Sequence, residues 1–105
     1  LRQELKGKWQ KISVPCVSIG SLWQKHFGGT RCHLLKIDIE GSEMNFLRAE
    51  PAFLSQVDSI LVEWHTWGST LDEIKKILAE HNFTYVKTIE ESEKMGTAFF
   101  RRNTV

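Results

Sequence analysis

The sequence lacks several features that would define a function by themselves. Only two of its 105 residues are cysteine, and the spacing of Cys16 and Cys32 fits neither a zinc knuckle nor a CxxC redox pair. Two buried free thiols are the default, with one disulfide as the alternative. No apolar run approaches the roughly 20 residues that a membrane helix needs, and no signal peptide is visible. A net charge of +1 gives no general signal for nucleic-acid binding.

Common catalytic and phosphate-binding patterns are absent as well. The chain has no Walker A sequence, no HExxH, no GxSxG and no GxGxxG turn after a strand. Its composition, 41% apolar and 26% charged, is ordinary for a globular chain. Residues 1–36 hold seven Lys/Arg and one acid, whereas residues 37–105 hold seven Lys/Arg and twelve acids. This asymmetry fits either an anionic-ligand site or a solvated surface.

Hydrophobic periodicity and turn residues predict an α/β fold with the element order β-α-β-α-β-β. Two helical crossovers imply parallel neighbouring strands, and a short polar loop before the last strand makes that strand antiparallel. The first strand is nearly continuous in apolar character, which is typical of a parallel strand covered on both faces. The predicted ranges are helix 1–9, extended segment 12–19, helix 21–27, strand 33–40, helix 42–50, strand 59–65, helix 70–82, strand 83–89 and strand 97–102.

Several residues mark the boundaries of these elements. Gly41 permits a sharp turn, Ser42 is placed to cap the next helix, and Pro51 stops or redirects it. Thr70-Leu71-Asp72-Glu73 is a capping box that starts a helix, and Asn82 is expected to end that helix in the left-handed backbone conformation.

Carboxylates cluster where strand 33–40 ends, the edge at which open α/β sheets bind their ligands. Asp38 and Glu40 share one face of the strand, and Glu43 falls in the first helical turn, where the helix dipole favours an acid. Carboxylates this close repel one another unless a cation or a donor-rich ligand faces them. Alternatively, Glu43 is a simple helix acid and Glu40 a surface residue, while Asp38 sits deepest in the strand.

A second cluster closes strand 59–65. Glu63 and His65 share a face that should open near Asp38 if the two strands are neighbours. His65 suits a general base, a metal ligand or a substrate partner, and the structural alternative is a half-buried His bonded to the backbone. Glu63 should be partly buried with a partner. Trp64 and Trp67 are expected to pack against the sheet, with a ligand wall as the alternative.

Potential metal donors are present in these two clusters, but no metal site is assigned from them. Their spacing matches no metal motif, so a metal-dependent hydrolase is only an alternative. The other three histidines are interpreted as structural or surface residues, and Arg101-Arg102 as facing solvent in alternation, with at most a weak phosphate contact. The potential donors are Asp38, Glu40, Glu43, Glu63 and His65.

The segment Leu35-Lys36-Ile37-Asp38-Ile39-Glu40-Gly41-Ser42-Glu43 resembles the hallmark of FkbM-type methyltransferases, [LI]-K-[IV]-D-[IVL]-E-G-x-E. Met44 to Leu47, Ile60 to His65 and Gly96 to Arg102 are similar to the family's next helix, its strand ending in an acid and often a His, and its closing strand. Residues 14–22 resemble the lead-in that usually ends in Leu-Asp, except that Trp23 stands in place of that Asp.

The resemblance implies a Rossmann-like enzyme that uses S-adenosylmethionine to methylate an oxygen of a sugar or other small molecule. Residues 1–33 would be a lead-in and 34–105 the substrate-side half of the sheet, its fourth to seventh strands, with the cofactor-binding half absent from residues 1–105. Asp38 would then be catalytic and contact the cofactor, and His65 would be catalytic. Glu40, Glu43 and Glu63 would bind the acceptor.

Two expectations concern the isolated chain. Without the cofactor-binding half, we expect no methyltransferase activity. The exposed edge of strand 34–40 should favour self-association, so a non-catalytic binding or assembly module is the alternative function. The expected partner is a small-molecule or glycan acceptor, with no nucleic acid and no membrane segment.

Overall fold

The structure of the chain is a computed structural model that describes residues 13, 15–39 and 41–104. The predicted helix 1–9 and Glu40 lie outside the described residues. Within the predicted extended segment 12–19, residues 13 and 15–18 belong to no strand, and Ile19 begins a helix. The elements are α1 (Ile19–Phe27), β1 (Leu35–Ile37), α2 (Glu43–Ala49), α3 (Pro51–Leu54), β2 (Ser59–His65), α4 (Leu71–Glu80), β3 (Phe83–Glu91) and β4 (Met95–Arg102).

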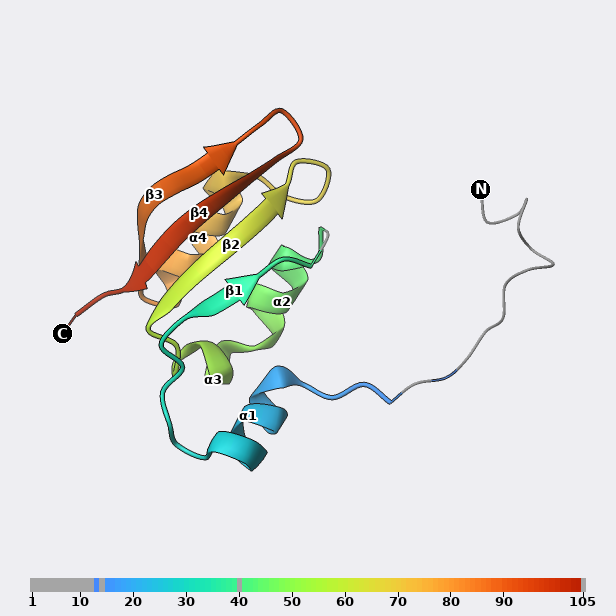
Figure 1. Ribbon diagram of the computed structural model, residues 1–105, viewed down its shortest axis with the longest axis vertical. Helices are drawn as coiled ribbons and strands as arrows, with labels where there is room; N and C mark the ends of the chain where they lie inside the picture. The colour runs from blue at the N-terminus through green and yellow to red at the C-terminus, as the bar shows by residue number, and fades with distance from the viewer. Residues whose placement is uncertain (1–12, 14, 40, 105) are drawn as a thin grey trace.

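The strands form one mixed four-stranded sheet in the order β1-β2-β4-β3 (Figure 1). β1 runs parallel to β2, as the first helical crossover predicts, and β4 is antiparallel to its neighbours, as predicted for the last strand. The prediction that β2 and β3 are parallel neighbours is wrong, because β4 pairs between them. α2 and α3 connect β1 to β2, and α4 connects β2 to β3. The fold is therefore α/β, and the carboxyl ends of β1 and β2 lie side by side.

Local sequence signals explain most of the element boundaries. Thr70 and Glu73 form the predicted capping box at the start of α4, and Asn82 adopts the predicted left-handed conformation after it, with φ of 68°. Pro51 redirects the chain by starting α3, a position where its missing N–H costs no hydrogen bond. Ser42 occupies the predicted N-cap position of α2, but its side chain makes no capping hydrogen bond.

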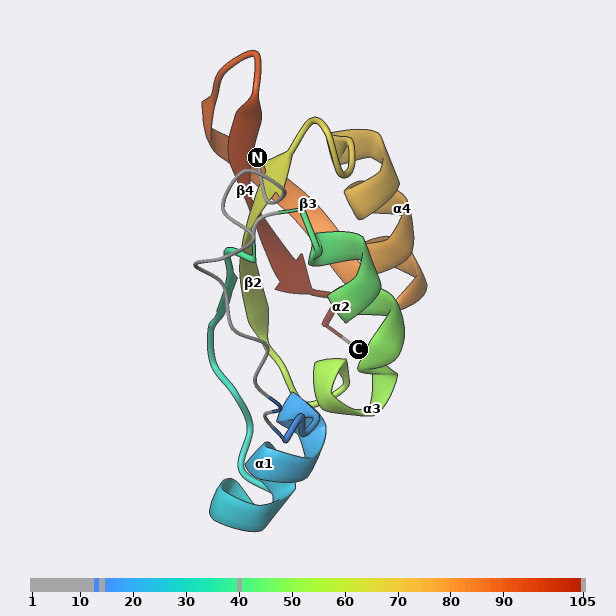
Figure 2. The same ribbon diagram turned by 90° about the vertical axis from the view of Figure 1, so that its right-hand side faces the viewer.

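The hydrophobic core lies on one face of the sheet. Figure 2 shows the sheet with α2, α3 and α4 all on the same side. α4 contributes the apolar stripe that its helical spacing predicts, and Trp64 is buried as expected. The core pairs across β2 and β4 are Ile60 with Phe100, Val62 with Ala98 and Trp64 with Gly96.

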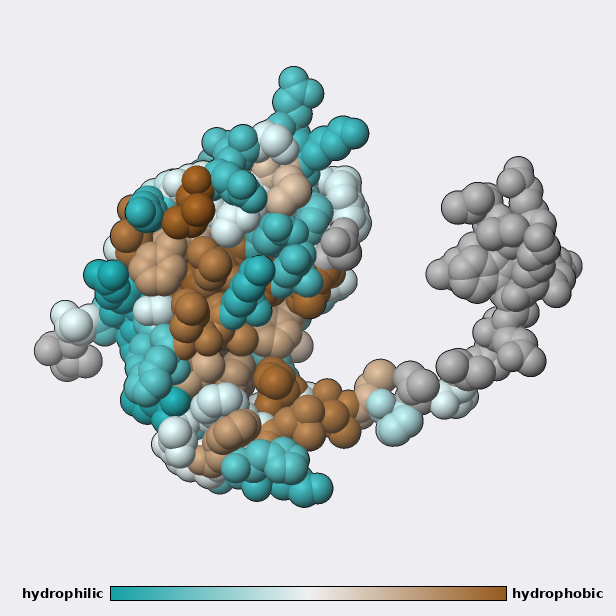
Figure 3. All heavy atoms as spheres, in the orientation of Figure 1, coloured by the Kyte–Doolittle hydropathy of each residue, from teal (hydrophilic) through white to brown (hydrophobic). Residues whose placement is uncertain are grey.

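None of the described helices covers the opposite face of the sheet, and Figure 3 shows apolar side chains gathered over its centre. A row of residues crosses β1, β2, β4 and β3 there, in the order Lys36, Leu61, Phe99 and Lys87. This corrects the prediction of a long first strand covered on both faces. β1 has only three residues, and Leu34 just before it is 56% exposed, because packed helices lie on one side alone.

Both cysteines are free thiols. Cys32 is buried, and burial raises the pKa of its thiol. Cys16 is exposed, so the expectation of two buried thiols holds for Cys32 only. Among the described residues, no helix combines the length and the apolar character needed to cross a membrane.

Candidate functional site at the ends of β1 and β2

Strand pairing brings three predicted site residues together. Leu35 to Ile37 pair in parallel with Ile60 to Val62, so the residues after β1 lie beside the end of β2. One ligand atom from each of Asp38, Glu63 and His65 lies within 4.8 Å of the other two. The expectation that the Glu63 and His65 face opens near Asp38 is therefore confirmed.

His65 is held by a buried carboxylate. The Oε1 atom of Glu43 lies 2.9 Å from His65 Nδ1 and accepts the Gly41 backbone N–H at 3.0 Å. Because a carboxylate can only accept, this contact assigns the proton to Nδ1 and directs Nε2 toward Glu63, whose Oε2 lies 3.4 Å away. His65 is therefore positioned by a side chain of α2 and not by a backbone group, which was the structural alternative.

Glu43 is the least expected member of the site. It is completely buried, whereas its place in the first turn of α2 also suited a simple exposed helix acid. Its Oε2 atom has no hydrogen-bond partner among the described residues. The contact with His65 crosses from the helix layer to the sheet and joins residues 22 positions apart, which local sequence patterns do not reveal.

Two glycines and an exposed tryptophan form one wall of the site. Gly41 has a φ of +91°, as its predicted role in a sharp turn requires, and a Cβ there would lie 2.2 Å from the Trp67 ring. A Cβ on Gly68 would lie 2.8 Å from the Gly41 carbonyl oxygen. Trp67 is 70% exposed, so the expectation that it packs in the core is wrong. Its ring lies 5.8 Å from that of His65, centroid to centroid.

The remaining predicted site residues have different outcomes. Asp38 is exposed and follows the last residue of β1, so the idea that it sits deepest in the strand is wrong. Glu63 is partly buried beside His65, as predicted. Glu40, a predicted substrate-binding residue, lies outside the described residues.

Charged groups away from the site have structural roles. Arg31 donates a hydrogen bond of 2.6 Å to Asp58, and this bond, helped by His33, holds the pKa of Asp58 below its usual range. Arg102 donates to the Val57 carbonyl at 2.7 Å, and burial lowers the pKa of its guanidinium. Arg102 therefore ties β4 to the segment after α3, whereas Arg101 is exposed, in agreement with the predicted alternation.

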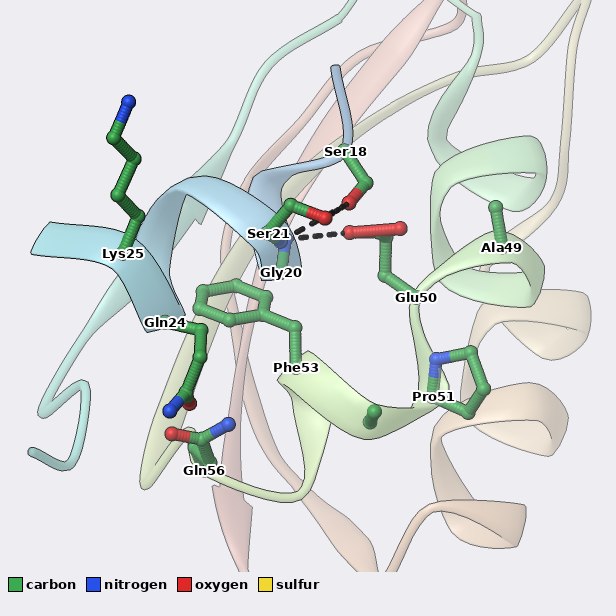
Figure 4. A pocket seen from close by; sticks show the side chains of 11 residues that line it. Ser18, Gly20, Ser21, Gln24, Lys25, Ala49, Glu50, Pro51, Phe53 and Gln56 are labelled. Carbon is green, nitrogen blue, oxygen red and sulfur yellow. Dashed lines mark hydrogen bonds between the residues drawn. The ribbon is translucent and has the colours of Figure 1, made fainter. Parts of the chain in front are cut away.

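An open hollow of about 770 Å³ lies between α1 and the segment 49–56 (Figure 4). Gly20 donates its backbone N–H to Glu50 Oε1 at 2.8 Å across this hollow, and Phe53 lies beneath α1. None of the predicted site residues lines the hollow, and no motif in the sequence marks it.

An α/β sheet with acids and a histidine at the carboxyl ends of adjacent parallel strands defines a candidate ligand-binding enzyme site. Residues 6–85 match the methyltransferase FkbM domain, which is more than half of the chain. The chain belongs to the FkbM methyltransferase family. Neither the curated proteins nor the solved structures gave a significant match to it.

Proposed function

We propose that the chain forms the acceptor side of a methyltransferase that transfers a methyl group from S-adenosylmethionine to a hydroxyl oxygen of a sugar or another small molecule. One observation carries the proposal. The hallmark segment 35–43 delivers Asp38 and Glu43 to the end of β2, where they meet Glu63 and His65. Methyl transfer in general follows from the family.

These side chains suit a bound hydroxyl. Each carboxylate accepts hydrogen bonds, and Asp38 is the most accessible of the three described acids because it lies beyond the strand end. We assign Asp38 to hold the acceptor hydroxyl and to take its proton as the new C–O bond forms. His65, fixed by Glu43, orients the acceptor beside Asp38. The exposed Trp67 ring next to His65 offers a flat apolar surface for a sugar ring.

The described residues fit S-adenosylmethionine only in part. Asp38 could accept a hydrogen bond from the amino group of the cofactor, and the cofactor would supply the electrophilic methyl group. The sequence has no glycine-rich turn after a strand to hold the rest of the cofactor. This supports the proposal that the chain is the C-terminal part of a Rossmann-like sheet and that cofactor binding needs further residues.

Calorimetric titration of S-adenosylmethionine and S-adenosylhomocysteine tests the proposal. We expect no binding and no turnover by the 105-residue chain, and binding by a longer protein in which this chain occurs. Within that protein, Asp38→Asn should reduce methyl transfer by roughly 100-fold or more, while Asp72→Asn on exposed α4 should not. Cofactor binding by neither protein, or full activity of Asp38→Asn, would reject the proposal.

A second candidate, a binding or assembly module, is favoured by the uncovered sheet face with Leu61 and Phe99 at its centre. The β1 edge adds backbone groups that can pair with another strand. Sedimentation equilibrium separates the two functions. Stable dimers of the chain that persist in a longer, cofactor-binding protein would favour the module.

A further inference from the structure

The cluster of Asp38, Glu63 and His65 has the composition of a metal site. Two carboxylates and one imidazole each place a ligand atom within 4.8 Å of the others, and they come from two neighbouring strand ends. We infer that these three residues bind one divalent transition-metal ion. Their spacing along the chain matches no metal motif, and the pairing of β1 with β2 is what brings the three donors together.

The contact between Glu43 and His65 supports the inference. Metal-binding histidines commonly donate their second ring N–H to a carboxylate, which fixes the tautomer and makes the other nitrogen a better ligand. In this chain Glu43 Oε1 lies 2.9 Å from Nδ1, and on the other side of the ring Nε2 lies 3.4 Å from Glu63 Oε2. With the proton on Nδ1, Nε2 can act as a ligand on the same side of the ring as Glu63 Oε2.

Charge and burial give an independent argument. Glu43 is completely buried, and its Oε2 atom has no hydrogen-bond partner within the described part of the chain. A buried carboxylate is unfavourable without a compensating positive charge nearby. Asp38, Glu43 and Glu63 together carry up to three negative charges around a single imidazole. A divalent ion among these side chains would balance two of these charges.

The donor set selects the kind of ion. Carboxylate oxygens suit Mg²⁺, Ca²⁺ and Mn²⁺, and imidazole suits the transition metals, so Mn²⁺ is compatible with both. Three protein ligands leave coordination positions open for water or a ligand, as in catalytic metal sites. Asp38 is exposed, which gives an ion access from solvent. The cation site does not depend on methyl transfer.

Titration of the purified 105-residue chain with Mn²⁺ tests the inference. Electron paramagnetic resonance measures free Mn²⁺, because the signal of the hydrated ion falls as the ion binds. We expect one bound Mn²⁺ per chain. Asp38→Asn and Glu63→Gln should each weaken binding by about tenfold or more, and Glu43→Gln by about tenfold through His65.

Matched controls use exposed acids outside the cluster. Asp72→Asn and Glu93→Gln remove the same charges and should leave Mn²⁺ affinity unchanged. Circular dichroism checks that each variant is folded, and the exposed position of Asp38 makes its variant the safest to interpret. Pulsed electron paramagnetic resonance should also detect a nitrogen nucleus coupled to Mn²⁺. This coupling should be absent from the spectrum of His65→Asn.

The outcomes separate this inference from the proposed function. Absence of Mn²⁺ binding, or equal affinity in Asp38→Asn and Asp72→Asn, would overturn the metal site. Neither result would affect cofactor binding by the longer protein, which is measured by calorimetry. Stoichiometric binding that depends on Asp38, Glu63 and His65 would support the site even if that protein transferred no methyl group.

Discussion

A single methyl group added at position 96 should disturb the core measurably. Gly96 lies in β4 opposite the buried Trp64, and a Cβ there would lie 2.2, 2.3 and 2.9 Å from three atoms of the indole ring. Because the clash is with a buried ring, the indole cannot swing into solvent to relieve it. Overpacking of this kind costs about 1–3 kcal/mol. Replacing Gly by Ala also stabilises by about 0.4–1 kcal/mol through the unfolded state, so the net loss should be about 1–2 kcal/mol.

Urea denaturation of Gly96→Ala followed by circular dichroism measures this loss, and the melting temperature should fall by roughly 5–10 °C. Gly29→Ala is the matched control, because nothing lies within 4 Å of its added Cβ. We expect that variant to be more stable than the original chain by about 0.4–1 kcal/mol.

A double-mutant cycle identifies the cause. In a Trp64→Leu background the indole is gone, so Gly96→Ala should become neutral or stabilising, with a coupling of about 1–3 kcal/mol. If Gly96→Ala were as stable as the original chain, or if its cost were unchanged with leucine at position 64, the packing argument would be wrong.

Three further predictions concern other parts of the chain. Asp58→Asn should lower the free energy of unfolding most at about pH 4 and higher, above the usual carboxyl range. The pKa of Asp58 is lowered in the folded chain, so its contribution to stability is present there and is lost as the pH falls through that pKa. The unfolding free energies of the two chains, measured with urea at several pH values, should converge at low pH, and a constant difference would contradict this. An alkylating reagent should modify Cys16 in the folded chain and Cys32 only after unfolding, as mass spectrometry would show, because Cys32 is buried with a raised thiol pKa. Gly68→Ala should weaken Mn²⁺ binding by about tenfold by displacing the loop after β2, and unchanged affinity in a folded variant would count against the close loop contact.

Local signals in the sequence predicted the elements that depend on neighbouring residues. The bounds of β2, the Thr70 capping box and the left-handed Asn82 follow from side-chain alternation, hydrogen-bonding geometry and backbone preference within a few positions. These forces are the same in the isolated segment and in the folded chain, which is why they can be read from sequence.

The site was predicted less completely because its environment is tertiary. The meeting of Asp38 with Glu63 and His65 followed from parallel strand order, and it was expected. The burial of Glu43 was not, because the helix dipole explains an acid at that position without any contact to β2. The sequence does not reveal the exposure of Asp38, because a continuous apolar run is typical of a strand covered on both faces, whereas α2, α3 and α4 cover only one face of this sheet.

The contact between the loops after β1 and β2 also constrains how the sequence can vary. A Cβ on Gly68 would lie 2.9 Å from the Gly41 Cα, and the positive φ of Gly41 already disfavours a side chain there. A side chain at position 68 requires the loop that carries Gly41 to move away, and a side chain at position 41 requires the Trp67 ring to move. Among related sequences, substitutions at these two positions should therefore occur together, and they should be accompanied by changes in loop length on either side.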